Sequence, residues 1–195
     1  SWLVNQFQTV LVVAFVILFQ PELRRLLIYV GQTRFFQQIF RAGTPKTITS
    51  IVDATTQLKE KGWGALIVIQ RETGLRSYKD QGMQIRGEVT SSLLLSIFSP
   101  SSPLHDGAVI IQNDLIDSAA CILPLTESKM IDSEMGTRHR AAIGISEETD
   151  ALVIIVSEEK SKVSLAENGK FVKRNLRAAT LEKYLNEKMF ISSQD

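Results

Sequence analysis

The chain has 195 residues, 44% of them hydrophobic, and its 22 basic and 21 acidic side chains leave a net charge of +1. This composition is that of a globular protein, so it excludes an intrinsically disordered chain, and the balanced charge gives no expectation of a nucleic acid partner. The single cysteine, Cys121, excludes an intrachain disulfide, and two histidines are too few for a three-histidine metal site.

The N-terminal segment is apolar, and no charged residue precedes Glu22. A helix over residues 1–30 is long enough to cross a bilayer, and the mainly basic residues that follow are typical of the cytoplasmic side of a membrane. We therefore predict a transmembrane or membrane-proximal helix at 1–30, a basic connector at 31–45 and a cytoplasmic domain at 46–190. Because this segment also contains polar residues, a surface helix docked on the protein or on a partner is the alternative: Asn5, Gln6, Gln8 and Thr9.

In the remaining chain, segments whose apolar residues recur at helical spacing alternate with short, continuous apolar runs typical of buried strands. This pattern favours an α/β fold with a mixed central β-sheet flanked by helices. The first predicted helix has Thr47 or Thr49 as its cap and stops at Gly62. The further elements, in chain order, are a strand at 65–69, a helix at 93–98, strands at 108–111 and 116–125, a helix at 138–148, a strand at 151–156 and an amphipathic helix at 172–189. The last helix is expected to bury Leu176, Ala179, Leu181, Leu185 and Met189.

The first candidate for chemistry is the segment 102–108, in which His105 and Asp106 come directly before a predicted buried strand. A carboxylate at the start of a strand can hold Mg²⁺ or Mn²⁺, and Gly107 lets a ligand approach the backbone closely. An Asp-Gly turn with a solvated carboxylate is the alternative. A phosphohydrolase of the HD type is disfavoured, because its site needs more histidines than this chain has.

The second candidate is the segment 136–142, in which Thr137 suits an N-cap and is followed by Arg138, His139 and Arg140. A helix N-terminus beside arginines is a natural phosphate site, whereas the alternative is a surface helix with a satisfied cap. Consecutive helical residues point about 100° apart, so these three side chains cannot all reach one phosphate. At least one of them is therefore expected to be structural.

The third candidate is the end of the strand at 151–156, where Ser157, Glu158 and Glu159 follow. Ligands of α/β proteins often bind at the carboxyl ends of strands, and two adjacent acids suit a metal or a ribose hydroxyl. The alternative is an acidic turn before Lys160. Together, the three segments suit nucleoside triphosphate chemistry, although their spacing does not name the reaction.

These segments resemble the diadenylate cyclase domain, whose DGA and RHR motifs match Asp106-Gly107-Ala108 and Arg138-His139-Arg140. Residues 19–25 are also similar to the helix-to-linker junction of the membrane-anchored (CdaA or DacA) type, so the resemblance covers about residues 19–190. That type has three transmembrane helices, of which the apolar segment here fits only the last.

The resemblance implies the joining of two ATP molecules into cyclic di-AMP with release of two pyrophosphates. It implies that Asp106 helps to deprotonate the ribose 3′-hydroxyl and, with His105, binds Mn²⁺ or Mg²⁺, and that Arg138, His139 and Arg140 are catalytic. The residues that it implies for ATP binding are Gly107, Ala108, the Leu123 backbone, Thr137, Arg138, His139, Ser157, Glu158 and Glu159. It also implies membrane anchoring and association with a membrane regulator and with phosphoglucosamine mutase.

A two-fold symmetric product needs two attacks, and one chain offers one copy of each motif, so an active face-to-face homodimer is expected. Two other classes of function stay open. One is a module of the same fold that senses ATP or cyclic di-AMP without turnover, and the other is a membrane scaffold whose helix recruits partners. Loss of product in Asp106→Asn would distinguish a cyclase from a sensor.

Overall fold

The structure is a computed structural model that describes residue 6, residues 45–128 and residues 135–190. The chain divides into two units, Ser1–Arg41 and Ala42–Asp195. Apart from Gln6 and Pro45, the expected apolar helix and basic connector lie outside the described residues. Within the described ranges, no helix is both long enough and apolar enough to cross a membrane.

The second unit is built on one seven-stranded mixed sheet with the strand order β2-β4-β3-β1-β5-β6-β7, which confirms the predicted α/β fold. Strand β1 pairs in parallel with β3 and antiparallel with β5. In chain order the elements are α3 (Pro45–Lys61), β1 (Ala65–Ile69), α4 (Arg76–Lys79), β2 (Met83–Glu88), α5 (Ser91–Phe98), β3 (Ala108–Gln112), β4 (Leu115–Cys121), α6 (Thr137–Glu148), β5 (Leu152–Val156), β6 (Val163–Glu167), β7 (Lys170–Lys173) and α7 (Ala178–Phe190).

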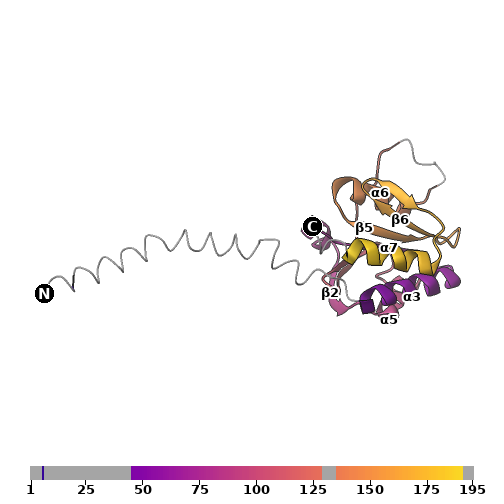
Figure 1. Cartoon of the computed structure of the whole chain (residues 1–195), viewed down its shortest axis with the longest axis horizontal. Coiled ribbons are helices and arrows are strands. Elements are labelled where there is room, and N and C mark those ends of the chain that lie inside the picture. The colour runs from indigo at the N-terminus through magenta and orange to yellow at the C-terminus, as the bar shows by residue number, and fades with distance from the viewer. Residues whose placement is uncertain (1–5, 7–44, 129–134, 191–195) are drawn as a thin grey trace. The chain divides into compact units, whose positions relative to one another are not determined.

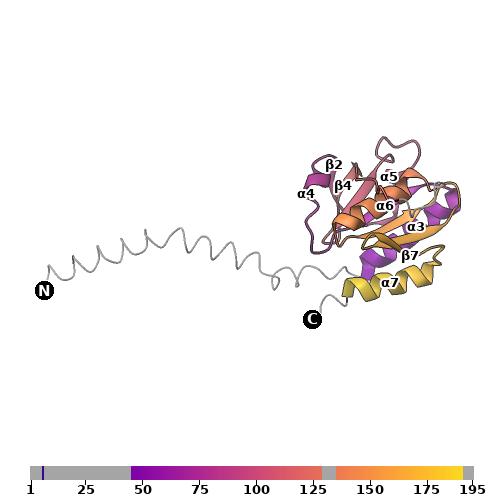
Figure 2. The same ribbon diagram turned by 90° about the horizontal axis from the view of Figure 1, so that it is seen from above.

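Helices cover both faces of the sheet, so its central strands are buried on both sides (Figures 1 and 2). Alternate residues of β1 belong to different cores: Ile67 packs with residues of α3, α5 and α7, whereas Val68 packs with residues of α6. The same alternation places Ile154 and Ile155 of β5 on opposite faces. This is why β1 and β5 read as continuous apolar runs in the sequence.

The candidate site lies along one end of the sheet, where β1, β3 and β6 start and where β5 and β7 stop. Because β1 and β3 are parallel and β5 is antiparallel to β1, the starts of β1 and β3 lie beside the end of β5. The pairing of Val156 with Val163 places the start of β6 at this edge, and the Leu176 N–H donates to the Val163 carbonyl (2.8 Å) just after β7. We call this row of strand ends, which runs across the sheet, the site edge.

Several predicted boundaries were wrong. Helix α3 begins at Pro45, whose fixed φ suits the first turn, so Thr47 is a buried helical residue rather than a cap. The strand predicted at 116–125 ends at Cys121. Residues 170–173, of which Lys170 and Lys173 are charged, form β7 instead of helix, so α7 begins only at Ala178 and Ala179 is exposed. Strands β2 and β6 and the short helix α4 were not predicted.

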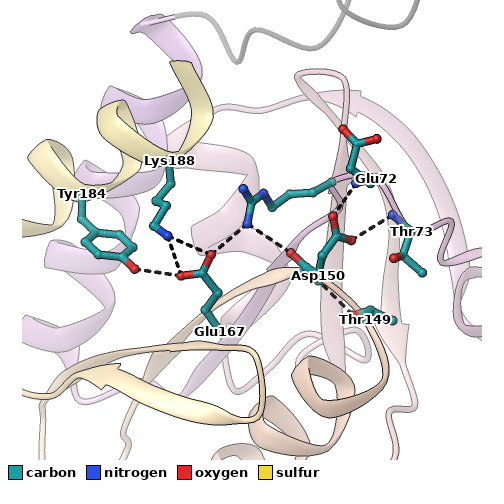
Figure 3. Close-up of polar contacts among 9 residues, drawn as sticks. Glu72, Thr73, Thr149, Asp150, Glu167, Tyr184 and Lys188 are labelled. Carbon is teal, nitrogen blue, oxygen red and sulfur yellow. Dashed lines mark hydrogen bonds and ion pairs between the residues drawn. The ribbon is translucent and has the colours of Figure 1, made fainter. Parts of the chain in front are cut away.

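A polar cluster joins α7 to the edge of the sheet opposite the site edge (Figure 3). Glu167, at the end of β6 and only 6% exposed, accepts hydrogen bonds from Arg71 (2.8 Å), the Tyr184 hydroxyl (2.9 Å) and Lys188 (3.1 Å). Burial alone would raise the pKa of Glu167, but these donors and the two cations hold it below its usual value. Burial and the Glu167 carboxylate raise the pKa of Tyr184 to about 12.

A second carboxylate of the same region fixes the loop after β1. Asp150 accepts hydrogen bonds from the backbone N–H groups of Glu72 and Thr73, both at 2.9 Å (Figure 3). This loop and the Glu167 cluster (Glu167, Arg71, Tyr184 and Lys188) tie β1, β6 and α7 together far from the candidate site. We therefore assign them a structural role.

Candidate active site

The N-terminus of α6 provides an anion-binding element at the site edge. Its N-cap is Gly136, not Thr137 as predicted, and Thr137 is the first helical residue. Glycine has no side chain with which to satisfy the first N–H groups of the helix, which carry the positive end of the helix dipole. A negatively charged ligand is therefore favoured at this end.

Arg138 and Glu158 form an ion pair that lies over the backbone of Gly64. The Arg138 Nη1 atom donates to Glu158 Oε2 at 2.9 Å, and the arginine side chain is 25% exposed while the glutamate is 62% exposed. A Cβ atom on Gly64 would lie 2.3 Å from Arg138 Nη1 and 3.2 Å from Glu158 Oε2. The absence of a side chain at Gly64 thus makes room for the pair, a role that the sequence motifs did not indicate.

A cavity of about 570 Å³ opens beside this pair, and we call it the α6 pocket. Its lining includes six of the predicted residues: Thr137, Arg138, His139, Ser157, Glu158 and Glu159. Ser157 is nearly buried and its hydroxyl accepts from the Lys160 N–H at 3.2 Å, which shapes the turn after β5. The structure therefore brings the second and third candidate segments together, as the sequence analysis expected for a shared site.

Three cations that the sequence analysis did not single out also line the α6 pocket: Lys160, Lys162 and Arg174. They come from the turn after β5, the residue before β6 and the residue after β7. Lys160 directly follows Glu159, but the proximity of Lys162 and Arg174 depends on the pairing of β5, β6 and β7 and is not visible as a motif. Only a correct prediction of both later strands would have revealed them.

His139 is held as a neutral side chain at the wall of the pocket. Burial lowers its pKa, and the nearby charges of Lys160 and Arg174 lower it further. Its ring packs against Phe171 of β7, and the centres of the two rings are 5.8 Å apart. At neutral pH the imidazole can therefore exchange hydrogen bonds with a ligand without adding a charge.

Arg140 is not among the residues that line the α6 pocket. Its Nη2 atom donates to the Thr126 carbonyl at 3.4 Å, and the Thr126 N–H donates to the Arg140 carbonyl at 3.2 Å. This pairing connects α6 to the segment after β4, where Leu123 is buried in the core. The three residues of the basic motif therefore divide their contacts, which agrees with the angle between consecutive helical side chains.

Asp106 precedes β3 at the site edge, and its side chain is exposed. Because Ile67 pairs with Val109 in the parallel β1–β3 ladder, continuing the register by three residues places Asp106 beside Gly64. The β1–β5 register likewise places Ser157 on the other side of Gly64. The two registers thus place Asp106, Gly64 and Ser157 at neighbouring positions in one row along the site edge.

The structure gives the glycine of the first motif, Gly107, a role in the packing of the sheet. Gly107 has a φ of 142°, and a Cβ atom on it would lie 2.6 Å from the carbonyl carbon of Ala120 in β4. The backbone of β4 is therefore a close neighbour that requires glycine at this position. Ala108, the next residue, is fully buried in the core on the α6 side.

His105 and Asp106 are compatible with a divalent cation. The His105 Nδ1 atom lies 2.6 Å from the Ser102 carbonyl, so it carries the proton and leaves Nε2 as the ligating atom. Mg²⁺ and Mn²⁺ are commonly held by one or two protein side chains together with phosphate oxygens of a substrate. An exposed carboxylate beside an oriented imidazole fits that donor set.

Residues 52–171 match the family described as DisA bacterial checkpoint controller nucleotide-binding (DAC), and the chain belongs to this family. Cyclic di-AMP synthase CdaA of Bacillus subtilis is 50% identical over 175 residues, which covers 87% of this chain and 63% of that protein. The chain thus spans less than two thirds of the length of this relative.

Two solved structures have the same fold. A crystal structure of a double mutant of DacA from Staphylococcus aureus matches with a TM-score of 0.72 and 43% identity, covering 74% of this chain and 96% of that one. A protein of Bacillus cereus, described as a hypothetical membrane spanning protein, matches with a TM-score of 0.64 and 40% identity. That match covers 80% of this chain and 78% of the other.

Proposed function

We propose that this chain is a diadenylate cyclase that joins two ATP molecules into cyclic di-AMP and releases two pyrophosphates. The observation that carries the proposal is the site edge, where the row of Asp106, Gly64 and Ser157 runs beside the uncapped N-terminus of α6 and the Arg138–Glu158 pair. Along this row, the Asp106 carboxylate can accept a hydroxyl proton, and Arg138 with the α6 N-terminus can bind a phosphate. One bound nucleotide can reach both. The name of the Bacillus subtilis relative supports the same reaction.

Each new linkage forms when the ribose 3′-oxygen of one ATP bonds to the α-phosphorus of the other. The bond from that phosphorus to pyrophosphate breaks, and the hydroxyl proton passes to the Asp106 carboxylate. Arg138 and the first N–H groups of α6 stabilise the negative charge that develops on the α-phosphate oxygens. A divalent cation bound by Asp106, His105 and phosphate oxygens would neutralise further charge there. Two such transfers close the ring.

The reaction requires two chains, because each chain supplies one acid and one phosphate site. In a face-to-face homodimer, each 3′-hydroxyl lies in line with the α-phosphate held by the other chain, so proximity supplies much of the rate. Membrane attachment through residues 1–30, with the catalytic domain in the cytoplasm, belongs to the same proposal. The description of the Bacillus cereus protein supports it.

The direct test is to incubate the purified chain with ATP and Mn²⁺, or with ATP and Mg²⁺, and to identify the nucleotides by mass. We expect one molecule of cyclic di-AMP for every two pyrophosphates released. The specific activity should rise with protein concentration, because the monomer is inactive. ATP that binds without reacting, even where light scattering reports a dimer, would instead indicate a sensing module. Constant specific activity down to concentrations where only monomer remains would contradict the dimer mechanism.

Gly64→Ala is expected to weaken ATP binding about tenfold with little change in melting temperature. The new methyl group displaces the Arg138 guanidinium, and a hydrogen bond to a charged group contributes about 1.5–3 kcal/mol, whereas a tenfold loss needs 1.4 kcal/mol. The fold tolerates the change because the contacted atoms are at the flexible end of a side chain. Titration calorimetry with an ATP analogue measures the effect. Gly74→Ala is the matched control, since nothing lies within 4 Å of its added Cβ.

A further inference from the structure

Two cations of the α6 pocket, Lys162 and Arg174, lie at the opposite end of the site edge from Asp106. Strand order places Asp106 at β3, Gly64 at β1, Ser157 at β5, Lys162 at β6 and Arg174 just after β7. Four strand spacings of about 4.8 Å separate β3 from β7, or about 19 Å in total. The site edge is therefore polarised, with the proton acceptor at one end and Lys162 and Arg174 at the other.

This polarity gives a direction to a bound triphosphate. The α-phosphate belongs at the α6 N-terminus and Arg138, in the middle of the row, and the ribose 3′-hydroxyl must approach Asp106. The rest of the triphosphate then extends away from Asp106, toward β6 and β7. At that end it meets Lys162 and Arg174 in the lining of the α6 pocket.

The charges of these two residues are available to a ligand. Throughout the described part of the chain, neither Lys162 nor Arg174 forms an ion pair with a carboxylate, whereas the half-buried cations Arg71 and Lys79 both do. The Phe171 ring positions the Arg174 side chain, whose guanidinium carbon lies 4.8 Å from the centre of the ring. Phe171 in turn packs against His139, so one aromatic side chain positions both a cation and an imidazole of the pocket.

We propose that Lys162 and Arg174 form a subsite for the β- and γ-phosphates of ATP, the part of the substrate that leaves as pyrophosphate. This inference rests on the proposed function for the placement of the α-phosphate. Charge-assisted hydrogen bonds from the two cations stabilise the triphosphate on binding and the charge that develops on pyrophosphate as its bond to the α-phosphorus breaks. The cyclic product has no β- or γ-phosphate, so the subsite distinguishes substrate from product.

The test compares two ligands that differ in this part. Titration calorimetry in Mg²⁺ measures the affinities for α,β-methylene-ATP, which cannot release pyrophosphate, and for cyclic di-AMP. Lys162→Met and Arg174→Met are each expected to weaken binding of the triphosphate analogue about tenfold and to change the affinity for cyclic di-AMP less than twofold. Lys170→Met is the matched control, because it removes an exposed cation from the opposite end of β7.

Arg174→Lys separates charge from packing. It keeps the cation but loses the planar contact with Phe171, so it is expected to retain more affinity for the triphosphate analogue than Arg174→Met. If the residues act only by shaping the pocket through Phe171 and His139, affinity for cyclic di-AMP falls by the same factor as affinity for the analogue. That result, or unchanged binding of both ligands, would overturn the subsite.

The outcome is separable from that of the proposed function. One outcome is that the wild-type chain forms no cyclic product, while Lys162→Met and Arg174→Met selectively weaken binding of the analogue. This result would support the subsite and refute the cyclase. The other outcome is that the wild-type chain forms cyclic di-AMP, while both variants bind the analogue as tightly as the wild type does. This result would support the cyclase and refute the subsite.

Discussion

Asp106→Asn is expected to lower the formation of cyclic di-AMP by about 10²- to 10⁴-fold, the range over which a positioned proton acceptor contributes to a rate. The amide has nearly the same shape, but it cannot accept the proton of the ribose 3′-hydroxyl. Because the side chain is exposed in front of β3, the fold does not depend on it. Product is measured by mass, and binding of α,β-methylene-ATP is measured by calorimetry in Mg²⁺.

Asp80→Asn is the control for this substitution, because it makes the same change at an exposed carboxylate that follows α4. The control should keep full activity, and both variants should keep the melting temperature of the wild type. Product formation by Asp106→Asn within tenfold of the wild type would exclude Asp106 as the proton acceptor. Undiminished binding of the analogue by a variant without turnover would assign the residue to the chemical step.

Glu167→Ala is expected to lower the free energy of unfolding by about 2–4 kcal/mol, because it removes the shared acceptor of a buried cluster. Arg71 and Lys188 lose their carboxylate partner, and the Tyr184 hydroxyl loses its acceptor. The expected loss is at the lower end for a buried ion pair, since Lys188 is 38% exposed and remains partly hydrated. Urea denaturation measures the loss, with Glu182→Ala on the exposed side of α7 as the control.

The same residue predicts a pH dependence. The pKa of Glu167 is lower in the folded chain than its ordinary value of 4.5, so its contribution to stability is complete above that pH. The contribution is lost as the pH falls through the folded pKa. Glu167→Gln cannot titrate, so its free energy of unfolding should fall less steeply than that of the wild type below pH 4.5. Parallel slopes for the two proteins would show that the carboxylate is not stabilised as described.

The parts of the fold that the sequence predicted are those in which burial determines the pattern. Ala65–Ile69 and Leu152–Val156 are wholly buried strands, and each is a continuous apolar run. Strand β7 is an edge strand in which Lys170 and Lys173 flank Phe171, and its pattern does not distinguish it from a helix start. Leu176 fits the helical spacing of α7, yet it lies in the segment that is bonded to Val163. That tertiary contact is invisible in the sequence.

The same division holds for the candidate site. The motifs indicated Arg138 and Glu158, which the structure joins in an ion pair, because helix starts and strand ends have local signatures. Gly64 had no such signature, since its role depends on a side chain 74 positions further along the chain. Lys162 and Arg174 were missed for a similar reason: their proximity requires β6 and β7, which were not predicted.

The pairing of β1 with β5 also has a consequence during synthesis on the ribosome. Ala65 pairs with Val156 and Ile69 with Leu152, so β1 waits for a partner that emerges 83 to 91 residues later. At about 5–20 residues per second, this delay lasts about 4–18 s, during which one edge of a wholly apolar strand is unpaired. Nascent chains that stop before Leu152 therefore expose an aggregation-prone edge. The last third of the polypeptide protects the first strand of the sheet as well as completing the pocket.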